Sequence, residues 1–182
     1  MNCTLLKFVD EIYHKDYPSF DLNKNRTKVL VTVFVEYIDK IDEILMSFSV
    51  KIHIKLEWFD SRLVFNNLRD EMNLVDSAIQ QRLWIPKLVF SNSLPLFQIA
   101  NDADSVTKIK KEGITLPRDK NDLHENKLYS GSSNPVSLER NIDLNLRCNF
   151  DFFFYPFDHQ SCSIMVKSFF NRIYLIHKCI QC

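Results

Sequence analysis

The sequence predicts a mostly β sandwich preceded by a short N-terminal α-helix. Two observations favour this class: several segments alternate apolar with polar residues, and helical spacing of apolar residues is confined to the start of the chain. Alternation of this kind is typical of strands with one buried and one exposed face. With 182 residues, 46% of them hydrophobic, the chain can bury one core, so we expect one domain.

The first expected elements are a helix and two strands. Residues 5–17 place apolar side chains at helical spacing and end before Pro18, which predicts a short amphipathic helix. Residues 28–37, "KVLVTVFVEY", alternate less cleanly but carry valines on one side. Residues 47–58, "SFSVKIHIKLEW", alternate strictly, so a strand is predicted there with His53 and Lys55 on its exposed face.

Two further strands are expected on either side of an aromatic segment. In residues 141–152, "NIDLNLRCNFDF", the alternation turns Cys148 inward, and in "CSIMVKSF" it groups Cys162 with Ile164 and Val166. Both cysteines are therefore expected on core-directed faces of separate strands, a placement that suits a disulfide. A closed loop of about 15 residues would stabilise the fold by roughly 3 kcal/mol. The chain has five cysteines, so at least one is free or intermolecular.

The segment between these cysteines, "NFDFFFYPFDHQS", is too apolar for an ordinary solvent-exposed loop. Tyr155 precedes Pro156, which allows a cis peptide bond. Phe150 and Phe152 continue the buried alternation, whereas Phe153 and Phe157 do not. The residues alone leave two interpretations open: all six rings plug one end of the core, or some of them contact a partner.

Charge and hydropathy exclude several classes of function. Lysine plus arginine and aspartate plus glutamate number 23 each. The chain therefore lacks the basic excess typical of nucleic-acid binding and the acidic excess typical of disorder. The most apolar stretch is interrupted by Thr32 and Glu36, so no membrane span is predicted. The N-terminus lacks the features of a secretion signal, yet Asn2 and Asn25 match the glycosylation pattern of secreted proteins.

Metal and hydrolase chemistry are not expected. Cys179 and Cys182 form a CxxC near His177, but no second pair of ligands accompanies them, so no metal site is predicted. The stretch "DHQSC" at 158–162 holds the residue types of a hydrolase, but neighbouring residues of an extended chain point in alternating directions and do not converge. We therefore expect no enzymatic activity and no cofactor.

The cysteine-bounded segment resembles the signature loop of the Cys-loop receptors, which are pentameric neurotransmitter-gated ion channels. The resemblance lies in two cysteines separated by thirteen residues with aromatic-Pro-Phe-Asp between them. "EWFDSRL" resembles the family's Trp-x-Asp-x-Arg-Leu, "LWIPKLVFSNS" its Trp-x-Pro-Asp segment, and "SGSSNPVSLERNIDLNLRC" the strand leading into the loop in invertebrate members. The resemblance implies an immunoglobulin-like β-sandwich over residues 1–170, incomplete at its C-terminal end, and a divergent tail over 171–182.

The resemblance also implies a location, partners and a coupling role. The domain would lie on the extracellular side of the cell membrane, in a homo- or hetero-pentamer that binds a small-molecule neurotransmitter between neighbouring subunits. The loop residues Tyr155, Pro156, Phe157 and Asp158 would rest on a membrane domain and transmit binding to the pore. Rings that meet a protein and lipid boundary would explain the aromatic surplus.

Candidate ligand-binding residues follow from the same resemblance. His53 and Lys55 would lie on the complementary face, where a cationic pair suits a carboxylate-bearing transmitter; the alternative is an ordinary solvated strand face. Val89 and Ser91 stand where the family has an aromatic, and Lys87 stands in place of its aspartate, which argues against an aromatic cage. Phe169 takes the position of a further binding aromatic that can hold a cation, or else packs at a strand end.

Beyond Phe170 the resemblance does not continue, and the family's capping loop and four membrane helices do not follow. We therefore expect a truncated product, an alternatively spliced form or an incomplete gene model. Two functions remain. The chain is the extracellular ligand-binding portion of a channel subunit that couples transmitter binding to ion transport, or it is a soluble transmitter-binding or assembly-modulating form without a pore.

Overall fold

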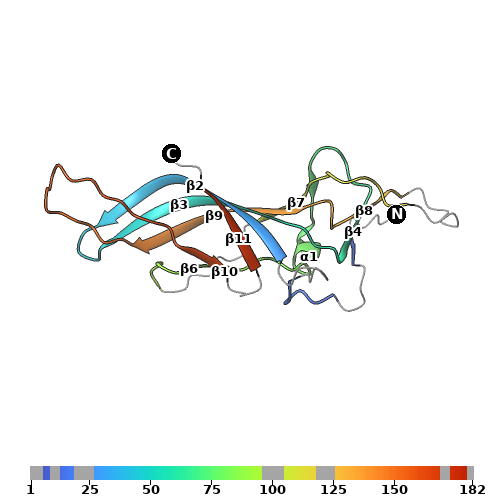
Figure 1. Cartoon of the computed structure of the whole chain (residues 1–182), viewed down its shortest axis with the longest axis horizontal. Helices are drawn as coiled ribbons and strands as arrows, with labels where there is room; N and C mark the ends of the chain where they lie inside the picture. The colour runs from blue at the N-terminus through green and yellow to red at the C-terminus, as the bar shows by residue number, and fades with distance from the viewer. Residues whose placement is uncertain are drawn as a thin grey trace.

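The computed structural model describes residues 6–8, 13–18, 27–95, 105–117, 126–168 and 173–179. Three long antiparallel strands run along the long axis of an elongated molecule (Figure 1): β2 (Thr27–Asp42), β3 (Ser47–Trp58) and β9 (Val136–Arg147). They form the centre of a six-stranded sheet of order β11-β2-β3-β9-β7-β5. The other members are β5 (Asn73–Leu74), β7 (Val106–Ile109) and β11 (Ile173–Cys179). The mostly β class is therefore confirmed.

Two small sheets complete the described part of the fold. β6 (Leu88–Phe90) pairs with β10 (Val166–Ser168) and lies on the core side of the large sheet (Figure 1). β4 (Leu63–Asn66) pairs with both β1 (Leu6–Phe8) and β8 (Leu128–Ser130). One short helix, α1 (Ser77–Gln80), occurs among the residues that the structure describes.

The alternation of β3 sets the position of the core. Its apolar side chains from Phe48 to Trp58 are all buried, whereas the intervening side chains after Ser47 are partly exposed, as the sequence predicts. Trp58 meets Trp84 edge to face at 6.1 Å between ring centroids, and both rings are almost fully buried. Leu88 and Phe90 of β6 belong to the same core, so the exposed side of β3 faces away from β6.

The N-terminal segment differs from the predicted helix. Leu6–Phe8 is a strand in which Leu6 pairs with Phe65, and the described residues 13–18 contain a turn; residues 5 and 9–12 lie outside the described residues. The helix prediction is therefore wrong over 6–8. The physical reason is that helical spacing is a weak local preference, and pairing with β4 supplies backbone hydrogen bonds while it buries Leu6.

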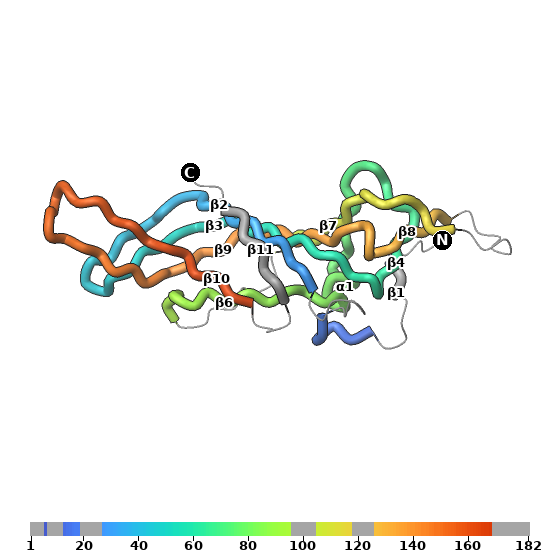
Figure 2. Tube along the Cα trace, in the orientation of Figure 1, coloured from blue at the N-terminus to red at the C-terminus, as the bar shows by residue number. Residues whose placement is uncertain are grey.

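Residues 13–18 are held by the end of the "WFDSRL" segment. The guanidinium of Arg62 lies 4.4 Å from the centre of the Tyr13 ring and donates hydrogen bonds to the carbonyl oxygens of His14 and Tyr17, at 3.5 Å and 3.0 Å. The fully buried carboxylate of Asp60 pairs with Arg62 at 2.7 Å. Figure 2 shows this blue segment below the right half of the molecule and the orange cysteine-closed loop at its left end.

Candidate functional site

The cysteine-closed loop is present as predicted. Cys148 and Cys162 form a disulfide with 5.5 Å between their Cα atoms, and the Tyr155–Pro156 bond is cis. Cys148 is buried immediately after β9, but Cys162 is exposed and lies outside any strand. The expectation that both cysteines face the core from strands holds for Cys148 only in its burial, since the strand ends at Arg147. It is wrong for Cys162, because strand pairing with β6 begins only at Val166.

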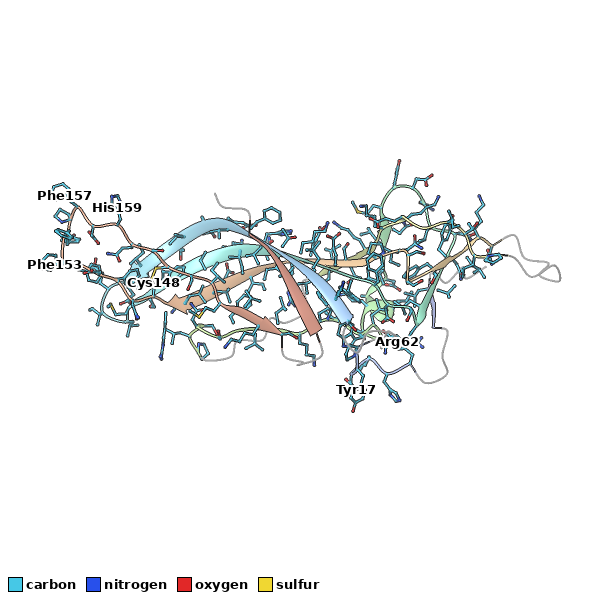
Figure 3. The ribbon with its side chains drawn as sticks, viewed as in Figure 1. Tyr17, Arg62, Cys148, Phe153, Phe157 and His159 are labelled. Carbon is cyan, nitrogen blue, oxygen red and sulfur yellow. A yellow bond between two sulfur atoms is a disulfide. The ribbon has the colours of Figure 1, made fainter. Side chains whose placement is uncertain are left out.

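The six rings of the loop divide into two groups. Phe150 is 7% exposed, and Phe152 packs beside it against the core with 5.7 Å between ring centroids. The other four rings are largely exposed, at 81% for Phe153, 69% for Phe154, 68% for Tyr155 and 87% for Phe157. Figure 3 shows Phe153 and Phe157 at the extreme end of the molecule, directed away from it. The interpretation in which all six rings plug the core is therefore wrong.

The turn between β2 and β3 lies beside the base of this loop. The backbone N–H of Cys148 donates to the carbonyl oxygen of Met46 at 2.9 Å. In the turn, the N–H of Leu45 donates to the carboxylate of Asp42 at 2.9 Å, and this bond holds the pKa of Asp42 below its usual value. We call the exposed apolar side chains of the turn, of the adjoining end of β2 and of the loop together the apolar end: Ile41, Ile44, Leu45, Met46, Phe153, Phe154, Tyr155 and Phe157.

His53 and Lys55 project from β3 on the side away from the core. One ring nitrogen of His53 lies 2.7 Å from the Asn141 side-chain oxygen, and the ring of Phe34 is 6.1 Å away between centroids. The Lys55 ammonium pairs with Glu57 at 3.0 Å. Both side chains are partly exposed. The two residues thus lie close together on one face, as the alternation predicts, but each already has a polar neighbour in the same chain.

Val89 and Ser91 lie on the other layer of the sandwich. Val89 is buried in β6 and paired with Lys167, and the backbone N–H of Ser91 donates to the carbonyl oxygen of Met165 at 2.9 Å. β6 contacts the core side of the large sheet, whereas His53 and Lys55 lie on the opposite side of that sheet. Within one chain, Val89 and Ser91 therefore lie apart from His53 and Lys55. Phe169, Asn2 and Asn25 lie outside the described residues.

Sequence reasoning missed the polar partners of the candidate residues. Asn141 stands opposite His53 across β3 and β9, and Glu139 stands opposite Lys55. Glu139 in turn pairs with Lys108 of β7 at 2.5 Å. These contacts follow from the strand register, and the alternation of a single strand carries no information about register. A pairing of the two alternating segments would have revealed them.

Metal and membrane features are absent from the described ranges. No group of three or more His, Cys, Asp or Glu side chains in them is placed to hold a metal ion. Likewise, no helix among the described residues is long and apolar enough to span a bilayer.

A β-sandwich with a disulfide-closed, ring-bearing loop at one end defines the ligand-binding module of the Cys-loop receptors. The family model described as "Neurotransmitter-gated ion-channel ligand binding domain" matches residues 4–177, and the chain belongs to this family. It is a family of ligand-gated channels and not of enzymes. The match extends beyond residue 170, and β11 lies partly within it; the division of the chain at 170 stays a prediction.

Curated relatives are identical to this chain at about a quarter of the aligned positions. The human gamma-aminobutyric acid receptor subunit rho-2 is 26% identical over 140 residues, which is 76% of this chain and 26% of that protein. The glutamate-gated chloride channel of Drosophila melanogaster is 28% identical over 145 residues, 78% of this chain and 26% of that protein. The chain therefore spans about a quarter of the length of the relatives that it matches.

Proposed function

We propose that this chain is the extracellular transmitter-binding part of a neurotransmitter-gated ion channel subunit and that it couples binding to ion transport through the apolar end. The observation that carries the proposal is the set of four exposed rings on a loop closed by Cys148 and Cys162. Each aromatic side chain presents roughly 150–250 Å² of surface, and contiguous exposed apolar area of this size marks an interaction site. In our proposal the partner is the membrane domain of the receptor.

The proposed ligand is a small molecule with a carboxylate. Two of the relatives are named for gamma-aminobutyric acid and for glutamate, and both of these compounds carry a carboxylate. Lys55 and His53 supply the positive charge and hydrogen-bond donor that a carboxylate requires. In the empty state the ion pair with Glu57 keeps the Lys55 ammonium oriented. When the ligand binds, its carboxylate replaces Glu57 as the partner of this ammonium.

The proposed site lies between two copies of the subunit. His53 and Lys55 come from one copy, and Val89 and Ser91 come from its neighbour, because the two pairs lie on different layers of a single chain. Phe169 is assigned to the neighbour's side from its place in the sequence. The proposal accordingly includes a pentamer on the extracellular side of the cell membrane, with Asn2 and Asn25 as glycosylation sites. Tyr155, Pro156, Phe157 and Asp158 of the loop belong to the coupling surface.

Ligand binding tests the proposal directly. Secreted chain with the disulfide intact is mixed with radiolabelled gamma-aminobutyric acid and, separately, glutamate, and saturable binding and particle mass are measured. Lys55→Ala is expected to weaken binding about tenfold or more, since hydrogen bonds to charged groups contribute about 1.5–3 kcal/mol.

Lys51→Ala is the matched control. Lys51 lies on the same face of β3 and has its own carboxylate neighbour, Glu36, at 4.0 Å. Binding by the Lys51 variant should equal that of the unaltered chain. The proposal fails if folded, oligomeric chain binds neither compound, or if both lysine variants weaken binding equally.

A further inference from the structure

A second closure joins the two arms of the cysteine-closed loop inside the disulfide. The side-chain amide of Gln160 donates from Nε2 to the carbonyl oxygen of Asp151 at 2.7 Å, and its Oε1 accepts from the backbone N–H of Asp151 at 3.0 Å. Both distances are those of good hydrogen bonds. Because an amide side chain has one donor group and one acceptor, it satisfies both backbone groups of Asp151, as a paired strand residue would.

The carboxylates of the loop extend this closure toward the tip, by which we mean the part of the loop that carries Phe153, Phe154, Tyr155 and Phe157. The Gln160 amide nitrogen also contacts Asp158 Oδ2, and the carboxylate of Asp151 accepts from the N–H of Phe153 at 3.0 Å. Two turns complete the tip, with the N–H of Tyr155 donating to the Phe152 carbonyl at 3.0 Å and that of Phe157 to the Phe154 carbonyl at 2.7 Å. Gln160 thus connects both ends of the exposed tip.

The core and the disulfide provide no comparable restraint on the tip. The rings of Phe153 and Phe157 are more than four-fifths exposed, and Phe153 contacts Phe154 edge to face at 4.8 Å between centroids. Cys148 and Cys162 lie outside the pair of residues that Gln160 connects, so the disulfide closes the loop farther from the rings. Among the described contacts, the hydrogen bonds between Asp151 and Gln160 are therefore the ones nearest to the tip that join the two arms of the loop.

We infer that Gln160 is a positioning residue that holds the four exposed rings in the orientation in which they meet their partner. This inference rests on the proposed coupling role of the apolar end, and it deepens that role by assigning the order of the tip to one side chain. Gln160 itself is exposed. It acts through the backbone of Asp151 and the carboxylate of Asp158.

Gln160→Glu is the discriminating variant. It keeps the acceptor for the Asp151 N–H but removes both donations and places a carboxylate beside Asp158. The charged or titratable groups near this position in the loop are Asp151, Asp158 and the adjacent, exposed His159. In the double variant Gln160→Glu with Asp158→Asn, the new amide donates to the new carboxylate, which restores one contact and removes the repulsion.

The measurement is quenched-flow hydrogen exchange at pH 7 on the oxidised chain, resolved at the amides of Asp151, Phe153 and Phe157. Gln160→Glu should accelerate exchange at these amides about tenfold, the double variant should recover much of the loss, and His159→Ala should change nothing. Exchange in β3 serves as the internal reference for an intact sandwich. Equal exchange in Gln160→Glu and unaltered chain, or no recovery in the double variant, overturns the inference.

Transmitter binding is measured on the same preparations. The described site residues lie on β3, on β6 and directly after β6, away from the loop, so Gln160→Glu should bind transmitter as the unaltered chain does while its tip exchanges faster. A chain that fails to bind transmitter contradicts the proposed function, whereas the exchange rates still decide the role of Gln160. The two failures are therefore distinguishable.

Discussion

Tyr13 links the N-terminal segment to the sandwich through one phenol. Its oxygen accepts a hydrogen bond from the backbone N–H of Trp84 at 2.7 Å, and its ring lies under the guanidinium of Arg62. Burial raises the pKa of Tyr13 from 10.0 to about 12, because the charged phenolate is poorly solvated there; the Trp84 bond acts in the opposite direction. A group whose proton is held more tightly in the folded state makes stability depend on pH.

The sign of that dependence is a loss of stability as the pH rises. Below pH 10 the folded and unfolded states both keep the proton, whereas between 10 and about 12 the unfolded state releases it first. We expect the unaltered chain to lose more free energy of unfolding between pH 9 and pH 11 than Tyr13→Phe does, measured by urea denaturation. Equal losses would contradict a raised pKa at Tyr13.

Single-strand patterns predicted which way a side chain points but not what it meets. The alternation correctly placed His53 and Lys55 on the exposed face of β3. It could not predict Asn141 as the neighbour of His53, because that contact depends on register. Glu57 lies on the same face two residues after Lys55, but whether the two pair depends on their rotamers. Their binding of a ligand depends on the association of two subunits and stays a prediction.

The cysteine-closed loop is the described element whose two ends are joined by a covalent bond. The disulfide joins residues 14 apart in sequence, and a loop of about 15 residues gains roughly 3 kcal/mol from closure in the chain-entropy model. Replacing both cysteines by serine should lower the free energy of unfolding by about that amount. Denaturation in urea under nonreducing conditions measures the difference.

Cys148 is buried, so its serine variant also places a hydroxyl in the core. Reduction of the unaltered chain followed by alkylation of Cys162 alone serves as the second measurement, because it leaves Cys148 in place. A loss below about 1 kcal/mol in both experiments would contradict the proposed contribution of loop closure.

Elements with an unambiguous pattern were predicted well, and those shaped by tertiary contacts were not. Twelve residues of strict alternation predicted β3 with the observed bounds, Ser47–Trp58. The helix over 5–17 failed at Leu6–Phe8 because an available strand edge at β4 outweighed a weak helical pattern. The strand expected from Cys162 starts only at Val166, where a partner strand becomes available.

At the scale of the molecule, the two ends of the sandwich differ in character. The apolar end lies at one extreme of the long axis, and the segment held by Arg62 lies toward the other (Figure 3). An end that exposes several large apolar side chains should associate with apolar surfaces when no partner covers it. This polarity of the molecule was not visible from the sequence, because the alternation does not place the turn of β2 and β3 beside the loop.

The double variant Phe153→Ser with Phe157→Ser tests this association. The purified chain should bind micelles of a nonionic detergent, detected as a shift in sedimentation, and the double variant should bind several-fold more weakly while transmitter binding is unchanged. Leu74→Ser with Val106→Ser is the control, because these side chains are also exposed but lie on β5 and β7, at the edge of the large sheet and outside the apolar end. Equal weakening by both pairs would argue against a dedicated surface.

The parallel pairing of β2 with β11 has a consequence for how the chain matures on the ribosome. β3 follows β2 immediately and can form a hairpin with it early, but the opposite edge of β2, from Thr27 to Val33, receives its strand only from Ile173–Cys179. During synthesis of everything in between, that edge offers unpaired backbone groups to other nascent chains. Slow translation would prolong this exposure, so a strand that emerges much later protects the first long strand from wrong partners.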